Sequence, residues 1–175
     1  GRDDLVVAYE APTSFRNYTD LLPRTQKGVY INTGTGFVRD DTFTGLPPFV
    51  TWNESDKKLN NLARIFLDVN GDGLPDIVAS YFYSESNGSP YANTTSEVLL
   101  NTGHGWIGSD LHFPAALARK PDKHGMKEFG DTGTRFADVN GDGLVDVLRG
   151  FRSEASLGEP RPQMDEKTVY LNTGN

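Results

Sequence analysis

The chain has 175 residues, enough for one domain of ordinary size, and it contains no cysteine, which excludes disulfides, zinc–thiolate sites and a cysteine nucleophile. A net charge of −7 argues against a nucleic-acid partner, and no apolar run reaches membrane-spanning length. With 19 Gly, 10 Pro and 36% hydrophobic residues, the composition favours many short strands joined by loops, and therefore an all-β fold.

The first elements of the chain are short strands separated by polar connections. Apolar residues predict a strand over 5–9, and a variable polar connection covers about 11–27. The segment Val29-Tyr30-Ile31-Asn32-Thr33-Gly34 predicts a second strand, whose final glycine permits the left-handed turn of a hairpin. A further strand starts at Gly36-Phe37-Val38, and an irregular stretch then covers 41–62.

The most informative stretch follows at 66–78, where an acidic, glycine-containing loop separates two apolar runs. Asp68, Asn70, Asp72 and Asp76 place side-chain oxygens at positions one, three, five and nine of this loop. Three carboxylates so close together repel one another unless a cation lies among them. All-oxygen ligation in an irregular loop suits calcium better than magnesium. We therefore expect Ca²⁺ here, with the backbone carbonyl of Leu74 at position seven.

The loop differs from an EF-hand at the position that decides the architecture. An EF-hand needs a bidentate Glu at position twelve and a helix on each side, whereas position twelve here is Ala79. Phe66 before the loop and Ile77 after it predict short buried strands instead. Gly73 stands at position six, where the chain turns sharply around the ion. The sequence therefore predicts a strand–calcium loop–strand unit; the alternative is an ordinary Asn-Gly or Asp-Gly hairpin turn.

The same pattern returns at 136–148, and this repetition favours metal binding over an ordinary turn. The second set of ligands consists of Asp138, Asn140, Asp142 and Asp146, with the carbonyl of Leu144 at position seven. Gly73 and Gly143 are 70 residues apart, and Gly1-Arg2-Asp3-Asp4 aligns with the second half of the loop, so Asp4 is the position-nine acid of a third copy. The Asn-Thr-Gly strand also occurs three times, at 29–34, 98–103 and 169–174. We expect repeats at 1–72, 73–142 and 143–175, the last one partial.

Each period predicts four antiparallel strands: one entering the loop, one leaving it, the Asn-Thr-Gly strand and a short fourth. Entering strands are expected at 64–67 and 134–137, and leaving strands at 77–82 and 147–151. Such a unit is typical of a β-propeller blade; a stacked solenoid is the main alternative. Pro114 and Pro121 confine the helix-favouring segment 114–120 to a turn or two, and the surrounding stretch 111–133 is irregular.

Four Asn-x-Ser/Thr sequons indicate the compartment. They lie at Asn17, Asn53, Asn87 and Asn93, and those at Asn17, Asn87 and Asn93 fall in stretches that we interpret as loops. We therefore expect a secreted or cell-surface glycoprotein.

These motifs resemble the FG-GAP/VCBS repeat, the blade unit of integrin α-subunit propellers and of many extracellular or toxin-associated propellers. The resemblance rests on Asp-Val-Asn-Gly-Asp-Gly-Leu-x-Asp in two full copies and one partial copy, together with the three Asn-Thr-Gly strands. It implies a calcium ion in each blade loop and a non-catalytic scaffold used for adhesion or recognition. Such propellers close with about six to eight blades, whereas this chain supplies about two and a half repeats. We therefore expect a larger propeller or repeat array, completed by further repeats of the same or a neighbouring chain, with a homopolymeric fibre as one form of it.

The sequence offers little for catalysis. His104, His112 and His124 are the only histidines, and no Gly-x-Ser-x-Gly, phosphate loop or His-Glu-x-x-His motif occurs. The acids that recur in register are accounted for as calcium ligands. We therefore expect a protein without enzymatic activity, which binds an extracellular protein or glycan.

Two other functions stay open. In a lectin-like, carbohydrate-binding propeller, Trp52, Trp106 and the aromatic run 81–83 would stack on a sugar face. The chain could also be the propeller part of a secreted toxin or enzyme assembly. Phe37 takes the place of Trp106 in the previous period, and a recurring aromatic residue usually packs between blades.

Overall fold

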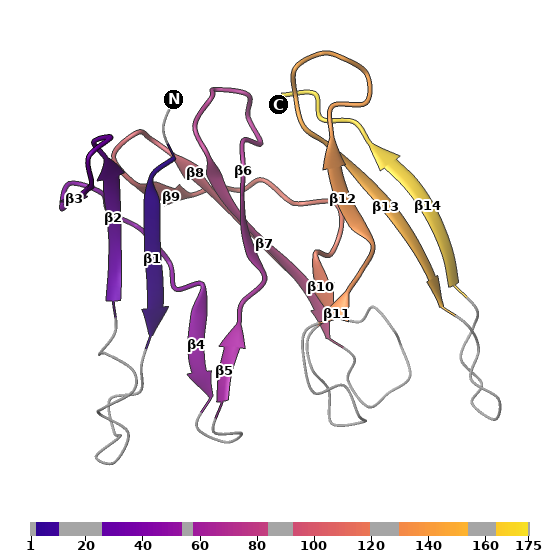
Figure 1. Ribbon diagram of the computed structural model, residues 1–175. Coiled ribbons are helices and arrows are strands. Elements are labelled where there is room, and N and C mark those ends of the chain that lie inside the picture. Colours follow the sequence, from indigo (N-terminus) through magenta and orange to yellow (C-terminus); the bar gives the residue numbers. More distant parts are fainter. Residues whose placement is uncertain are drawn as a thin grey trace.

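The computed structural model describes residues 3–10, 26–53, 58–83, 93–119, 130–153 and 164–174, and within these ranges it contains strands and no helix (Figure 1). The strands, in chain order, are β1 (Leu5–Glu10), β2 (Gln26–Asn32), β3 (Phe37–Asp40), β4 (Val50–Asn53), β5 (Lys58–Asn61), β6 (Arg64–Leu67), β7 (Asp76–Tyr83), β8 (Asn93–Asn101), β9 (Trp106–Gly108), β10 (Ala118–Arg119), β11 (Gly130–Asp131), β12 (Thr134–Ala137), β13 (Asp146–Ser153) and β14 (Met164–Tyr170). The all-β prediction is confirmed for this part of the chain.

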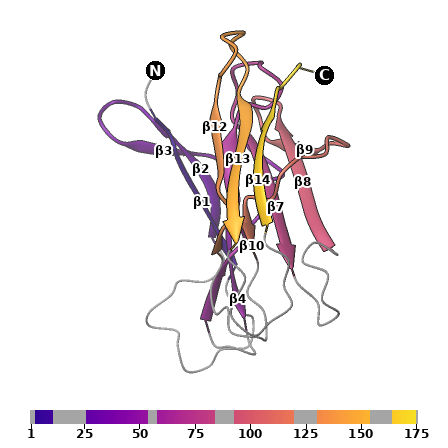
Figure 2. The ribbon, with the colours of Figure 1, turned by 90° about the vertical axis from the view of Figure 1, so that its right-hand side faces the viewer.

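The strands form three sheets that follow one another along the chain. The first sheet has the order β3-β2-β1-β4-β5, the second has β11-β10-β7-β8-β9 with β6 also paired to β7, and the third has β12-β13-β14. They lie side by side in Figure 1, and Figure 2 shows the third sheet in front of the other two. The described strands make open sheets, and their order shows no closed barrel or propeller.

The strands on either side of each acidic loop form where the sequence predicts them. The entering strands β6 and β12 have the predicted bounds, and they pair antiparallel with β7 and β13. The leaving strands begin one residue before the predicted start, because the position-nine acids Asp76 and Asp146 already pair with the entering strands. The four-stranded antiparallel unit is complete in the second sheet, in the order β6-β7-β8-β9.

The two stretches expected to be irregular contain extra strands. Within 41–62 the hairpin β4–β5 adds to the first sheet, and within 111–133 the hairpin β10–β11 adds to the second. Both join the leaving strand in parallel, with Tyr9 opposite Val50 and Tyr81 opposite Ala118. The entering strand covers only the first half of the long strand β7, so its second half has unpaired backbone groups that the added hairpin satisfies. The segment 114–117 is irregular and leads into β10, so the short helical turn expected near there is absent.

Two hydrophobic cores lie between the sheets. Val29, Ile77 and Trp106 centre the core between the first and second sheets, and Val78, Val98 and Val147 centre the core between the second and third. Ile77 and Val78 are 1% and 0% exposed, because successive residues of β7 point to opposite faces and both faces are covered. Each such side chain stabilises the fold by about 1.5–3 kcal/mol.

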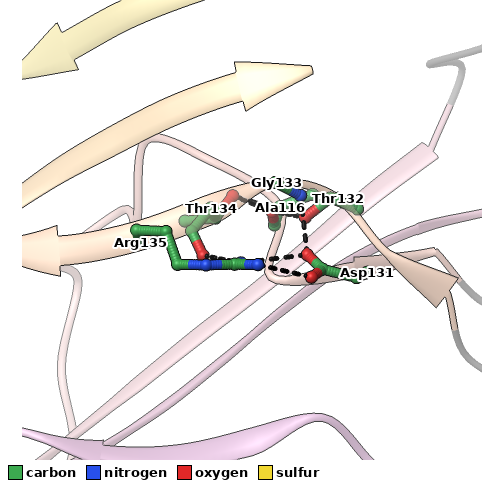
Figure 3. Close-up of polar contacts among 6 residues, drawn as sticks. All are labelled: Ala116, Asp131, Thr132, Gly133, Thr134 and Arg135. Atoms are coloured by element: carbon green, nitrogen blue, oxygen red, sulfur yellow. Dashed lines mark hydrogen bonds and ion pairs between the residues drawn. The ribbon is translucent and has the colours of Figure 1, made fainter. Parts of the chain in front are cut away.

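The connection that precedes each new sheet is held by polar groups of that sheet. The carbonyl of Ala116 accepts hydrogen bonds from the hydroxyls of Thr132 and Thr134, at 2.5 and 2.6 Å (Figure 3). It also accepts a bond of 3.2 Å from the guanidinium of Arg149, which is 4% exposed and paired with Glu166. In the previous period the guanidinium of Arg64 does the same for the carbonyl of Pro48, at 2.6 Å.

Candidate functional site

The two acidic loops lie at the same end of neighbouring sheets, between β6 and β7 and between β12 and β13 (Figure 1). They contact each other directly. The side chain of Leu144 packs so closely over Gly71 that a Cβ at position 71 would overlap it. The side-chain amide of Asn172, which follows β14, donates a 2.9 Å hydrogen bond to the carbonyl of Val69. The loops are therefore one continuous surface formed by two sheets.

In the first loop, Asp68 and Asp72 accept backbone hydrogen bonds from the turns that they begin. The carboxylate of Asp68 accepts from the amides of Gly71 and Gly73, at 2.8 and 2.9 Å. The carboxylate of Asp72 accepts from the amide of Leu74 at 2.8 Å and from the side-chain nitrogen of Asn70 at 2.9 Å. Gly73 has a φ of 84°, in the left-handed region that the sharp turn requires and that glycine adopts without strain.

The second loop reproduces these contacts one by one. Asp138 accepts from the amides of Gly141 and Gly143 at 2.7 and 2.9 Å, and Asp142 accepts from the amide of Leu144 and the side chain of Asn140, both at 2.8 Å. Two segments 70 residues apart thus adopt one conformation. The two loops share these hydrogen bonds, and the repeats at 1–72, 73–142 and 143–175 stay a prediction.

The position-nine acid of each loop ties it to the Asn-Thr-Gly strand of the same sheet. Asp76 is fully buried and accepts from the amides of Val69 and Asn101, at 3.0 and 2.7 Å. The corresponding bonds in the third sheet join buried Asp146 to the amides of Val139 and Asn172, at 2.9 and 2.8 Å, and in the first sheet Asp4 accepts from the amide of Asn32 at 2.9 Å.

Sequence reasoning missed this pairing of acid and asparagine. The signal was available, because the two residues recur together in every period at separations of 28, 25 and 26 residues. The position-nine acids are therefore structural residues of the sheets, whatever else they bind.

Burial and neighbouring charge both affect the pKa of the position-nine acid in the first loop. Burial raises the pKa of Asp76 above its ordinary value, and the nearby carboxylates of Asp72 and Asp68 raise this pKa further, while the bonds from the amides of Asn101 and Val69 oppose the shift. A cation among these oxygens would relieve the repulsion that the neighbouring carboxylates exert.

The donor set suits a hard divalent cation, but the described conformation does not gather it around one point. Within the described residues, no group of three or more acidic or histidine side chains is arranged to hold a metal ion. In the first loop the side-chain nitrogen of Asn70 also donates to the carboxylate of Asp72. For both side chains to present oxygens to an ion, the Asn70 amide must rotate. The carbonyls of Leu74 and Leu144 as ligands stay predictions.

The other residues singled out in the sequence are scattered. Trp106 is 5% exposed and lies in the core between the first and second sheets, so the interpretation of a packing residue is confirmed for it. Phe37, at the corresponding place in the first sheet, is 54% exposed. His104 and His112 lie in separate loops, and His124 is outside the described residues.

The sequons are placed only in part. Asn17 and Asn87 lie outside the described residues. Asn53 ends β4, and Asn93 begins β8, so Asn93 is in a strand and not in the loop that the sequence predicted. Glycosylation at any of the four stays a prediction.

Within the described residues, no helix is long and apolar enough to cross a membrane. No protein-family model, curated protein or solved structure matches this chain. The functional argument therefore rests on the chain's own repeats.

Proposed function

We propose that this chain is a non-enzymatic, calcium-stabilised repeat module of an extracellular scaffold or adhesion protein, of the FG-GAP/VCBS type. The observation that carries the proposal is the acidic loop itself. Two copies with the same oxygen donors in the same register have the same hydrogen bonds and lie in contact at one end of the molecule. A hairpin turn needs no such set of acids, so the repeated donors favour a common ligand.

In this proposal Asp68, Asn70, Asp72 and Asp76 hold one ion, and Asp138, Asn140, Asp142 and Asp146 hold the other. Bound Ca²⁺ supplies positive charge that offsets the repulsion among the carboxylates. The chain's own residues carry the effect into the fold, because the buried acids Asp76 and Asp146 connect each loop to the Asn-Thr-Gly strand through hydrogen bonds. The ion thus stabilises a sheet and has no part in a reaction.

Calcium removal tests the proposal. At a free calcium concentration ten times the dissociation constant, each ion adds about 1.4 kcal/mol to stability. Two ions together raise the melting temperature of a domain of this size by about 6–11 °C. The measurement is thermal denaturation in calcium and in excess chelator, with magnesium as a second ion. Equal melting temperatures in all three would contradict the proposal.

Single substitutions assign the ions to their loops. Asp72→Asn and Asp142→Asn each leave about one ion per chain by calorimetry, against two for the parent. Asp41→Asn is the matched control, because Asp41 is an exposed acid outside both loops, paired with Arg39. Two ions retained in either loop variant would remove that loop's acid from the ligand set.

The extracellular part of the proposal rests on the four sequons. It predicts that secretion from eukaryotic cells adds N-linked glycans, with Asn17 as the best candidate since it lies in a variable connection, and with Asn87 as the poorest because Pro90 directly follows its sequon. Intact-mass measurement before and after enzymatic removal of N-glycans reads this out. The scaffold role is favoured over sugar binding because Trp106, one of the aromatic residues considered for stacking on sugar, is buried between sheets.

A further inference from the structure

Trp106 occupies a defined place between the first and second sheets. Its ring lies 5.6 Å from that of Phe43 and 6.1 Å from that of Phe66. The indole N–H donates a 3.0 Å hydrogen bond to the carbonyl of Pro75. Its strand, β9, pairs with the outer edge of β8, with Trp106 opposite Asn101. An aromatic residue on the fourth strand therefore anchors that strand and closes the core between two sheets.

The matching place between the second and third sheets is a cavity of about 190 Å³. The repeat makes the comparison residue by residue, because each residue around Trp106 has a counterpart one period later. Six residues line the cavity at places that correspond to the surroundings of the indole. The pairs, with the residue near the indole first, are Val29 and Val98, Phe43 and Phe113, Pro75 and Val145, Ile77 and Val147, Leu99 and Tyr170, and Asn101 and Asn172. The cavity between the second and third sheets therefore corresponds to the volume that Trp106 fills between the first and second sheets.

The strand that would carry such a residue is also absent from the described part of the third sheet. That sheet ends at β14, whereas the corresponding β8 has β9 on its outer edge. The carbonyl of Val98 accepts from the amide of Ser109 at 3.1 Å, so the residues of β8 that share its orientation direct their backbone groups to β9. The counterparts on the third sheet, Val169 and Leu171, have no such strand beside them among the described residues.

We propose that this cavity and the outer edge of β14 form a docking site for one strand of a further repeat, with the sequence Gly-aromatic-β-branched. The strand pairs with residues 169–172, its aromatic side chain fills the cavity, and an indole there donates to the carbonyl of Val145. This inference rests on the proposed function as a repeat module, since it names the partner of that module. The occupant is chosen because the same chain places Gly105-Trp106-Ile107 in the equivalent site.

One local difference affects the strength of docking. The amide of Thr44 donates to the carbonyl of His104, and the carbonyl of Thr44 accepts from the amide of Trp106. The residue after Phe113 is Pro114, which has no N–H to donate. The amide of the incoming strand can therefore still donate to the carbonyl of Pro114, but the carbonyl of the incoming strand finds no backbone N–H there.

A chain extended after Gly174 with the sequence of residues 104–110 tests the proposal directly. The matched control carries the same extension with Ala in place of Trp. We expect the Trp extension to melt about 5–10 °C higher than the Ala extension, because a large aromatic side chain fills a cavity that Ala leaves empty. The added Trp should also be shielded from acrylamide quenching. Equal melting temperatures and a fully quenched Trp would overturn the proposal.

Two further measurements locate the effect and identify the occupant. Leu111→Trp fills the cavity from its rim, where Leu111 is 38% exposed, and should abolish the difference between the two extensions. Ile107→Trp, at an exposed apolar residue outside the cavity, should leave the difference unchanged. If N-acetyltryptophanamide added to the parent chain raises the melting temperature as much as the extension does, the cavity is a small-molecule site and strand docking is wrong.

All melts are recorded in calcium and in chelator. An extension without effect, together with a lower melting temperature in chelator, refutes the docking strand and leaves the proposed function standing. An effective extension with no response to chelator supports docking and refutes the calcium sites.

Discussion

Replacing Arg64 by alanine should destabilise the second sheet, because Arg64 joins that sheet to the connection leading into it. Its guanidinium donates 2.6 Å hydrogen bonds to the carbonyl of Pro48 and to the carboxylate of Glu97. The arginine side chain is 14% exposed and that of Glu97 is 41% exposed. Both hydrogen bonds are partly buried, and the ion pair is the one with a half-exposed partner.

The magnitude follows from these exposures. A hydrogen bond from a charged group contributes about 1.5–3 kcal/mol, and the ion pair with half-exposed Glu97 is screened to less than about 1 kcal/mol. The Nε of Arg64 is buried without a partner, which reduces the gain. We expect Arg64→Ala to cost about 2–3 kcal/mol, or about 5–10 °C in melting temperature.

The third sheet has an arginine–glutamate pair in another arrangement, which can be built into the second sheet to restore its stability. The arginine of the third sheet is on the adjacent strand, because Arg149 lies opposite Thr134 as Ala79 lies opposite Arg64. The glutamate partner also stands at a different place: Glu166 corresponds to Thr95, two residues before Glu97, and lies opposite Phe151. The second sheet acquires this arrangement through Arg64→Thr, Ala79→Arg, Thr95→Glu and Glu97→Thr together.

Thermal and urea denaturation of four chains decide the matter: the parent, Arg64→Ala, Arg64→Thr and the fourfold variant. The fourfold variant should recover more than half of the stability lost by Arg64→Thr. If Arg64→Ala shifts the melting temperature by less than about 1 °C, the arginine does not hold the connection. If the fourfold variant is no more stable than the single one, the two arrangements are not equivalent.

Three other changes give separate tests. Gly45→Ala should cost more than about 2 kcal/mol in chemical denaturation, because its φ is 72° and a Cβ would overlap the facing strand's backbone, whereas Gly36→Ala, with open space around it, should cost less than about 1 kcal/mol. Asp76→Ala should cost about 2–4 kcal/mol even in chelator, by leaving two amides unpaired, whereas Asp72→Ala should have little effect there; similar losses in chelator would contradict the division of roles. Hydrogen bonds from an arginine and a backbone amide lower the pKa of Asp131 from 3.8 to about 2, so its stabilisation is complete above pH 3.8 and is lost as the pH falls toward 2. Since its side chain is 61% exposed, this amounts to less than about 1 kcal/mol, and an NMR titration that places the pKa near 3.8 would refute the ion pair.

The acidic loops and their flanking strands could be predicted because their structure is local. Asp68 and Asp72 accept from amides within five residues, and the glycines provide the turn without help from the rest of the chain. The strands β6 and β12 follow from the apolar runs that precede the loops. Because the loop and its flanking strands occur twice in the sequence, the second copy supports each local inference from the first.

The hairpins β4–β5 and β10–β11 could not be predicted in the same way. Their sequences have no clear alternation, and β10 has only two residues in register. They become strands because the second halves of β1 and β7 offer unpaired edges. These segments are extended because they pair with strands that lie elsewhere in the chain.

The sequence by itself determined the all-β class, the period and the donor residues of the two loops, since each depends on residues close together in the chain. Only the tertiary structure decided which aromatic residue is buried. Trp106 and Phe37 hold the same place in the repeat, yet one is 5% exposed and the other 54%. The physical reason is that this face of a sheet becomes a core only where another sheet covers it, and the arrangement of the sheets determines where that occurs.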